Sequence, residues 1–263
     1  MNLNNIYTPI TQDIESLENE IKSLVMSIKN EKIREKYNRF FSKEGKYLRP
    51  MLLFLSARAT TKDASKFNKD LVSLAFALEL LHSASLVHDD IIDEDLMRRG
   101  QKTLNNIFGN KVAVLTGDTF FSYAFALVAD LFPKEYIKLV TSLSLQMCMS
   151  ELEQASGIDS LENYLSVIEG KTAKFTSVCC ELGARYAMAD ENQIKELSDF
   201  GLYLGMAYQI KDDFQDSDPN ALKYITLETA EEYYIKAKDI LNNVRASEYK
   251  ESLFILLDYI MAM

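Results

Sequence analysis

The chain has 263 residues and a formal net charge of −10, which argues against a nucleic-acid partner because binding a phosphate backbone needs a concentrated basic surface. It contains only four prolines and nine glycines, and no stretch rich in proline, glycine or serine divides it, so we expect a single domain over residues 1–263. Alternating strand patterns are not evident, which predicts an all-α fold.

The cysteine content indicates whether the protein works in a reducing or an oxidising compartment. Cys148, Cys179 and Cys180 form no Cys-x-x-Cys pair and are odd in number, which fits a reducing environment better than a disulfide framework. The N-terminal residues lack the basic and apolar regions of a secretory signal. We therefore expect a cytoplasmic protein.

The first part of the chain predicts an amphipathic packing helix and a possible anion site. Apolar residues recur at helical spacing over about residues 11–37, with acids and lysines between them. Gly45 then opens a loop, Lys46 and Arg49 lie three residues apart, and Pro50 stands where a first helical turn tolerates it. Cations and free backbone donors at a helix start can bind an anion, although such cations are more often simply solvated.

The helix expected over about residues 71–93 is apolar around most of its circumference and ends in carboxylates. Asp89 and Asp93 are four residues apart and therefore share one helical face. His82 lies seven residues before Asp89, on nearly the same face. A lone histidine in an apolar helix is more often a satisfied core residue, so the residues alone leave core and site roles evenly matched.

The segment from Gly109 to Pro133 is apolar enough to raise the question of a membrane span. Asp118 interrupts it, and its charge-free part is short for a bilayer. We expect a second buried helix of the bundle and no transmembrane segment.

A second acidic cluster repeats the first far downstream. Asp212 and Asp216 are again four residues apart on a predicted helix. In the same helix Gly201 and Gly205 are also four apart, which permits a neighbouring helix to approach closely.

The two acidic clusters predict a metal-bridged diphosphate. Carboxylate oxygens suit hard cations such as Mg²⁺, and Mg²⁺ typically binds through few carboxylates together with substrate phosphates. A single acidic run is usually a solvated helix face, but two copies that each adjoin an apolar helix favour a functional site. Two such faces opposed across a cavity would hold several Mg²⁺ ions.

Five motifs in order and spacing resemble the trans-isoprenyl diphosphate synthase family, in particular its long-chain, octaprenyl-diphosphate-synthase-like members. They are GKYLRP, HSASLVHDDIIDEDLMRRG, GDTFFSYAFAL, EGKTAKF and GMAYQIKDDFQD, and they cover the chain from about Phe40 to Asp216. The resemblance implies the isoprenoid synthase fold, an all-α bundle around a deep apolar cavity, usually as a homodimer. It also implies Mg²⁺-dependent condensation of isopentenyl diphosphate with an allylic diphosphate primer.

The same resemblance assigns roles to individual residues. The implied metal ligands are Asp89, Asp90, Asp93, Asp212, Asp213 and Asp216. The positions that match the isopentenyl diphosphate site are Gly45, Lys46, Arg49, His82 and Arg99. The positions that match contacts to the allylic diphosphate are Arg98, Lys171, Thr172 and Gln209. Asp89, Asp93, Lys171 and Asp212 are expected to act most directly in catalysis.

The product length is predicted from the residues before the first acidic cluster. Short-chain relatives place a bulky aromatic residue at the fourth or fifth position before Asp89, where this chain has Ala84 and Ser85. Small side chains leave room for a growing tail, so we expect a product longer than farnesyl diphosphate, of the octaprenyl type. We expect Phe120 or Phe121 to be the next bulky side chain that closes the bottom of the product cavity.

One departure from the family lies after Asp216. Relatives continue with a lysine-bearing turn that helps to close the site, but here SDPNALKYIT leads almost at once into the next helix. Either the chain works without this lid or the sequence omits a mobile loop.

Several other functions are open to the same residues. Within the family, a short-chain farnesyl or geranylgeranyl diphosphate synthase is the first alternative. A terpene cyclase or a head-to-head condensing enzyme would use similar Mg²⁺ chemistry, and the intact basic set of Lys46, Arg49 and Arg99 argues against a cyclase. A regulatory subunit of a heteromeric prenyltransferase is favoured by the short segment after Asp216 but opposed by two complete acidic motifs. A di-iron bundle fails because the chain lacks the two Glu-x-x-His pairs that such a site needs.

Overall fold

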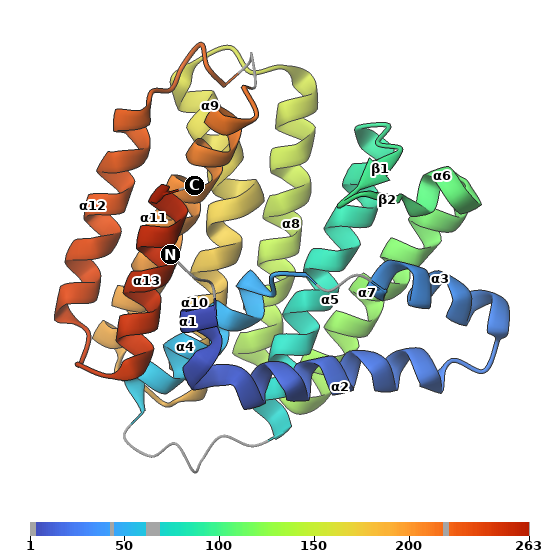
Figure 1. Ribbon diagram of the computed structural model, residues 1–263, viewed down its shortest axis with the longest axis horizontal. Helices are drawn as coiled ribbons and strands as arrows, with labels where there is room; N and C mark the ends of the chain where they lie inside the picture. The colour runs from blue at the N-terminus through green and yellow to red at the C-terminus, as the bar shows by residue number, and fades with distance from the viewer. Residues whose placement is uncertain (1–3, 43–44, 62–68, 218–220, 263) are drawn as a thin grey trace. The chain divides into compact units, whose positions relative to one another are not determined.

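The structure is a computed structural model that describes residues 4–42, 45–61, 69–217 and 221–262. Helices account for almost all of the regular structure, as Figure 1 shows, so the predicted all-α class is confirmed. The helices are α1 (Asn4–Tyr7), η1 (Thr8–Ile10), α2 (Thr11–Ser27), α3 (Glu31–Phe41), α4 (Leu48–Thr60), α5 (Lys69–Ile92), α6 (Leu104–Phe108), α7 (Asn110–Leu131), α8 (Lys134–Ser156), α9 (Leu161–Ile168), η3 (Glu169–Ala173), α10 (Lys174–Tyr186), α11 (Glu191–Gln215), α12 (Leu227–Asn243) and α13 (Glu248–Ala262). A two-stranded antiparallel hairpin joins β1 (Met97–Arg98) to β2 (Gln101–Lys102).

The helices form two compact units. The first unit contains α1, η1 and most of α4. It also contains the chain from Lys138, one turn into α8, through α13. The second unit contains α2, α3, the first residues of α4, α5, the hairpin, α6 and α7. A single domain over residues 1–263 stays a prediction.

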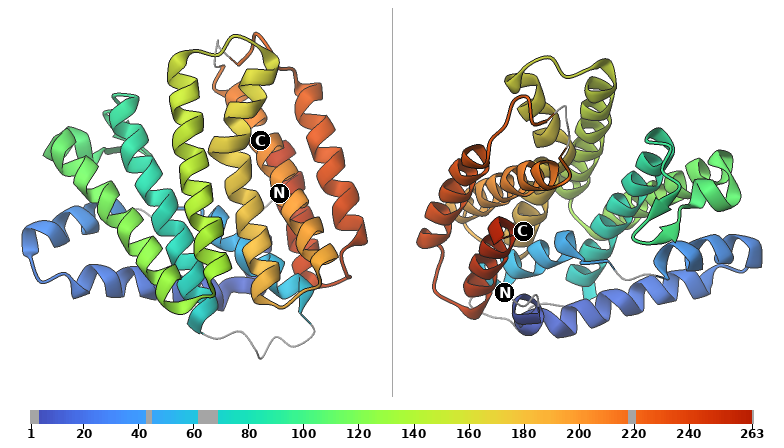
Figure 2. Two further views of the ribbon diagram at one scale, coloured as in Figure 1. Left: turned by 180° about the vertical axis from the view of Figure 1, so that it is seen from behind. Right: turned by 45° about the horizontal axis from the view of Figure 1, so that its top comes forward.

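In the first unit, α10 and α11 pack at very short range, which two glycines of α11 permit. A Cβ atom on Gly201 would lie 2.5 Å from the backbone oxygen of Thr176, and one on Gly205 would lie 2.5 Å from Cα of Ala173. Any larger residue would force the two backbones apart. The close helix approach predicted from the Gly201 and Gly205 spacing is confirmed, and Figure 2 shows the helices of this unit side by side.

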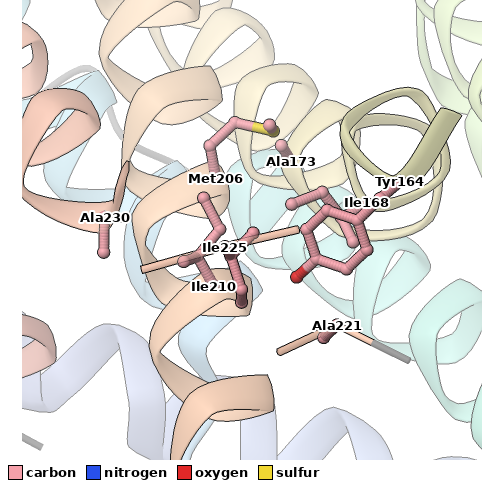
Figure 3. Close-up of a cluster of buried hydrophobic side chains, with 8 residues drawn as sticks. All are labelled: Tyr164, Ile168, Ala173, Met206, Ile210, Ala221, Ile225 and Ala230. Carbon is pink, nitrogen blue, oxygen red and sulfur yellow. The ribbon is translucent and has the colours of Figure 1, made fainter. Parts of the chain in front are cut away.

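A cluster of buried apolar side chains ties the short α11–α12 connection to the first unit. Figure 3 shows its members, which are Tyr164, Ile168, Ala173, Met206, Ile210, Ala221, Ile225 and Ala230. Ala221 and Ile225 come from the connection itself and are 1% and 4% exposed. The segment that follows the second acidic motif is therefore held at these two residues by burial of apolar surface.

In the second unit, α5 and α7 run side by side, as both figures of the whole chain show. Tyr37, Phe40 and Phe41 of α3 surround Phe120 of α7, with ring centroids 4.9 to 5.3 Å from the Phe120 ring. Phe120 is fully buried in this aromatic cluster. Phe120 therefore packs between α3 and α7. Its predicted role in closing the cavity below a growing product stays a prediction.

Two helix predictions are wrong. The single helix expected over about residues 11–37 is divided into α2 and α3, because Asn30 caps α3 by accepting bonds from the N–H groups of Lys32 and Ile33. The chain therefore turns at residues 28–30 before it continues as α3.

The expectation of a buried helix at α7 is also wrong in part. By length and composition alone, both α5 and α7 are apolar enough to cross a membrane, but 61% of the apolar window of α5 is buried and only 33% of that of α7. Val114, Leu115, Tyr123 and Leu131 of α7 are exposed. A high apolar content in α7 thus marks an uncovered face rather than a central helix.

Candidate active site

The first acidic motif lies at the C-terminal end of α5. The Asp93 N–H group donates to the Asp89 carbonyl at 2.8 Å, and the Asp95 N–H group donates to the Asp90 carbonyl at 2.9 Å. Glu94 adopts a left-handed conformation with φ 54°, so the last turn closes as a Schellman motif. Three carboxylates thereby stand at the negative end of a helix dipole, an arrangement that a bound cation stabilises.

The middle aspartate of this motif has partners within the protein. Asp90 is buried, and its carboxylate accepts a bond from the Nε–H group of Arg98. Arg98 Nη2 also lies 3.7 Å from Asp95 Oδ2. Burial raises the pKa of Asp90, while the hydrogen bond and charge of Arg98 oppose that rise. Asp90 thus fixes the hairpin strand that carries Arg98 to the end of α5.

The hairpin turn presents Arg99 to a pocket. Arg99 and Gly100 have φ values of 50° and 74°, as a two-residue type I′ turn requires. The pocket lies within the second unit, and its lining residues include Gly45, Glu79, Ser83, Arg98 and Arg99. A Cβ atom on Gly45 would lie 3.1 Å from Arg99 Nη1 and 3.8 Å from Glu79 Oε1, so a larger residue would crowd Arg99. The pocket combines positive charge with close backbone approach, as an anion site requires.

His82 and Arg49 meet beside Glu79 in the second unit. Arg49 Nη1 lies 3.1 Å from His82 Nε2. Burial lowers the pKa of His82 well below its usual range, and the charges of Arg49, Arg99 and Arg98 lower it further. His82 is therefore neutral and accepts the bond that Arg49 donates. Of the predicted isopentenyl diphosphate residues, the structure places Gly45 beside Arg99 and Arg49 beside His82, while Lys46 is exposed in the preceding loop. Their role in binding stays a prediction.

The second acidic motif lies in the first unit and ends its helix in the same way. The Asp216 N–H group donates to the Asp212 carbonyl at 2.9 Å, and Ser217 is left-handed with φ 55°. In both motifs, therefore, the last aspartate caps the helix C-terminus and the first lies one turn earlier.

A hydrogen-bond network holds Asp213. The Tyr164 hydroxyl donates to Asp213 Oδ2 at 2.5 Å, and the Gln209 amide donates to Asp213 Oδ1 at 2.7 Å. Gln209 in turn accepts a bond from the Thr172 hydroxyl at 2.8 Å. The predicted residues Thr172, Gln209 and Asp213 thus form one connected set, with Tyr164 as a further member.

Lys171 lies on the π-helical segment η3 and contacts α8. Its Nζ atom lies 2.5 Å from Glu151 Oε2 and 3.0 Å from Gln154 Oε1. The neighbouring Gly170 permits this approach, because a Cβ atom there would lie 1.9 Å from Ser150 Oγ. Single π-helical turns are frequent at functional sites, since the extra residue redirects nearby side chains.

Two polar residues of these sites were not singled out in the sequence. Glu79 was detectable as a lone acid inside the apolar run of α5, whereas Tyr164 carries no signal in its neighbourhood. Within the described residues, no group of three or more His, Cys, Asp or Glu side chains converges on one metal position.

The predicted chain-length residues lie next to this region on α5. Ala84 is fully buried, and the Ser85 hydroxyl donates to the His82 carbonyl at 2.9 Å. Their effect on product length stays a prediction.

Sequence comparisons point to one family. The family model described as polyprenyl synthetase matches residues 30–223. Octaprenyl diphosphate synthase of Haemophilus influenzae is 37% identical over 180 residues, which cover 67% of this chain and 54% of that protein. Heptaprenyl diphosphate synthase component 2 of Geobacillus stearothermophilus is 34% identical over 220 residues, covering 82% of this chain and 67% of that protein. The chain thus spans only about half the length of several curated relatives.

Solved structures agree with the sequence comparisons. A decaprenyl diphosphate synthase from Rhodobacter capsulatus matches with a TM-score of 0.90 and 25% identity over 99% of both chains. A geranylgeranyl pyrophosphate synthetase from the archaeon Geoglobus acetivorans matches with a TM-score of 0.83 and 25% identity, over 97% of this chain and 99% of that one. The fold predicted by resemblance is therefore confirmed. Together with the family match over most of its length, this likeness shows that the chain belongs to the polyprenyl synthetase family.

Proposed function

We propose that the protein is a Mg²⁺-dependent trans-prenyltransferase that condenses isopentenyl diphosphate with an allylic diphosphate. Its product is a polyprenyl diphosphate longer than C15. The observation that carries the proposal is the pairing, within one unit, of a carboxylate cluster at the end of α5 with a pocket that contains Arg99. The carboxylate cluster suits a diphosphate that is bridged by metal ions, and the Arg99 pocket suits a diphosphate that is bound directly by cationic side chains. The names of the octaprenyl and heptaprenyl relatives support the long product.

The acidic motifs fit Mg²⁺ by their chemistry. Their donors are all carboxylate oxygens, and in each motif two aspartates lie four residues apart at a helix end. We assign binding of several Mg²⁺ ions to the six aspartates of the two motifs, Asp89, Asp90, Asp93, Asp212, Asp213 and Asp216. Asp90 and Asp213 also accept hydrogen bonds from Arg98 and Tyr164, which orient the motifs. When bound, Mg²⁺ supplies positive charge to the diphosphate that leaves the allylic substrate.

The residues of the chain then perform three tasks. Arg98 and Lys171 add positive charge toward the leaving allylic diphosphate, so that the allylic C–O bond breaks with its electron pair on oxygen. Arg49 and Arg99 hold isopentenyl diphosphate, whose double bond attacks the resulting carbocation as a proximity effect. The released diphosphate accepts the proton that is lost, which restores an alkene one isoprene unit longer.

A homodimer is the proposed assembly. On α8, Leu145, Met149 and Leu152 are 65%, 58% and 63% exposed at positions i, i+4 and i+7, so they form one apolar stripe. Exposed apolar residues also lie on α7. Uncovered apolar helix faces of this kind typically contact another chain.

The short α11–α12 connection supports activity without a longer lid. Ala221 and Ile225 are buried in the cluster of Figure 3, and the Tyr224 hydroxyl donates to the Ile158 carbonyl at 3.5 Å. We propose that the chain functions with this connection in place. A cytoplasmic location is also proposed, supported by Cys148, Cys179 and Cys180, which are odd in number and form no Cys-x-x-Cys pair.

The test is incorporation of labelled isopentenyl diphosphate into an organic-extractable product in the presence of farnesyl diphosphate and Mg²⁺. Asp89→Asn and Asp212→Asn are expected to reduce the rate by at least about 100-fold, because each removes charge that holds the metal. Asp199→Asn is the matched control, since Asp199 lies on α11 with Asp212 but pairs with Lys195. Wild-type rates in both aspartate variants would contradict the proposal.

A second candidate function is one component of a two-component prenyltransferase. The name of the Geobacillus stearothermophilus relative, heptaprenyl diphosphate synthase component 2, favours it. Turnover by the purified protein alone contradicts this candidate. A folded protein that binds diphosphate but is inactive alone supports it.

A further inference from the structure

Glu79 is a buried carboxylate with no assigned role at the edge of the anion pocket. It is 8% exposed, and its Oε2 atom has no hydrogen-bond partner in the structure. Burying a carboxylate costs free energy unless a nearby charge offsets the loss of water. The charges that act on Glu79 are those of Arg49 and Arg99. The carboxylate therefore adjoins the two arginines that the proposed function assigns to isopentenyl diphosphate.

The other charged groups around the pocket do not replace Glu79 in this position. Arg39 from α3, Asp90 from α5, Arg98 from β1 and Lys102 from β2 line the same pocket. Asp90 is bound by Arg98, and His82 on α5 is neutral and bound to Arg49. Glu79 is thus the carboxylate that faces Arg49 and Arg99.

We propose that Glu79 is a positioning residue for this pocket, whose buried carboxylate is the counter-charge that holds the Arg49 and Arg99 guanidinium groups in place until a diphosphate binds them. This inference rests on the proposed function of the pocket. A diphosphate that enters becomes the new partner of both arginines, since phosphate oxygens bind guanidinium groups more fully than one carboxylate can. Glu79 is then left buried beside a second anion.

A coupled proton follows from this exchange. Burial raises the pKa of Glu79 to about 7, and the charges of Arg49 and Arg99 limit that rise. A bound diphosphate offsets those two charges and adds negative charge nearby, so the pKa of Glu79 rises further. At pH 8 the carboxylate is mostly ionised in the empty pocket, and it takes up a proton when diphosphate binds.

The test is calorimetric titration of the full-length protein with inorganic diphosphate at pH 8, in two buffers that differ in ionisation enthalpy. EDTA is present, so that diphosphate cannot bind the aspartates through Mg²⁺. The wild type is expected to take up about one proton more per site than Glu79→Gln, which keeps the shape of the side chain but cannot ionise. Glu181→Gln is the matched control, because it removes another partly buried Glu–Arg pair, in which Glu181 lies 2.8 Å from Arg185 on α10. Its proton uptake is expected to match that of the wild type.

A pH series adds a readout that a merely structural role of Glu79 would not change. Above pH 7 the affinity of the wild type for diphosphate is expected to fall by up to about tenfold per pH unit relative to Glu79→Gln. Equal proton uptake and equal pH slopes in the two proteins would overturn the inference. If Glu79→Gln does not fold, Glu79→Asp takes its place. It should keep the proton uptake but bind more weakly, and wild-type affinity in that variant would overturn the inference.

The experiment separates this inference from the proposed function. Diphosphate binding with the expected proton uptake, but no prenyl transfer under any condition, would contradict the function and leave the role of Glu79 intact. Prenyl transfer without a difference in proton uptake would contradict only the role of Glu79.

Discussion

Asp213 illustrates how single residues organise the second acidic motif. Its two carboxylate oxygens accept bonds from Tyr164 and Gln209, so its side chain is fixed at the end of α11. Hydrogen bonds to a charged group typically contribute about 1.5–3 kcal/mol each. The orientation of the motif therefore depends on residues outside it.

The substitution Tyr164→Phe tests whether the Tyr164 hydroxyl orients the second acidic motif. Loss of the hydroxyl donor should loosen Asp213 and raise the Mg²⁺ concentration for half-maximal prenyl transfer by about tenfold. The measurement is a Mg²⁺ titration of activity. Tyr224→Phe is the control, because that hydroxyl makes only a 3.5 Å contact with the Ile158 carbonyl. An unchanged midpoint in Tyr164→Phe would show that the network does not orient the motif.

His82 gives a prediction about pH and stability. In the folded protein the pKa of His82 lies well below its usual range, mainly through burial. In the unfolded chain a histidine binds a proton below about pH 6.5, so the free energy of unfolding falls as the pH falls through that value. Between pH 7.5 and 5.5 the wild type should lose about 1.4 kcal/mol more than His82→Gln, measured by urea unfolding. Parallel pH profiles would mean that the pKa of His82 is the same in the folded and the unfolded chain.

At the scale of helices, the pairing of α10 with α11 depends on backbone contact. Gly205→Ala would place a methyl group 2.5 Å from Cα of Ala173, which the backbone cannot accommodate without moving. We expect a loss of roughly 1–3 kcal/mol in the free energy of unfolding, measured by urea titration. At Gly117 on α7 the contact within 2.3 Å is the end of the His88 side chain, which can rotate away. Gly117→Ala should therefore cost much less, and equal costs would refute the argument.

Sequence patterns predicted those elements whose signal is local. The ends of α5 and α11 were predictable because their aspartates and apolar spacing lie within one helix. The break between α2 and α3 was missed because one capping residue, Asn30, outweighed continuous apolar spacing. The exposure of α7 was missed because apolar content does not tell which surface covers a helix. Tyr164 and Glu79 act through residues distant in sequence, so only the fold reveals their partners.

At the scale of the whole molecule, the apolar stripe of α8 predicts self-association. Leu152→Lys should convert the proposed dimer to a monomer, because a lysine within an apolar interface loses water without gaining a partner. The measurement is sedimentation equilibrium over a range of protein concentrations. Leu227→Lys is the control, since Leu227 is also an exposed leucine, at 45%, but lies on α12. A wild-type protein that stays monomeric at all concentrations would contradict the prediction.

Prenyl chain elongation is the central activity proposed for the whole molecule. The most direct measurement is the mass spectrum of products formed from isopentenyl diphosphate and farnesyl diphosphate by the purified protein with Mg²⁺, with EDTA in a parallel reaction. We predict a Mg²⁺-dependent series of prenyl diphosphates extended by several five-carbon units. A single addition would contradict the predicted product length at Ala84 and Ser85. No product from a folded protein that binds diphosphate would contradict the proposed activity of the chain by itself.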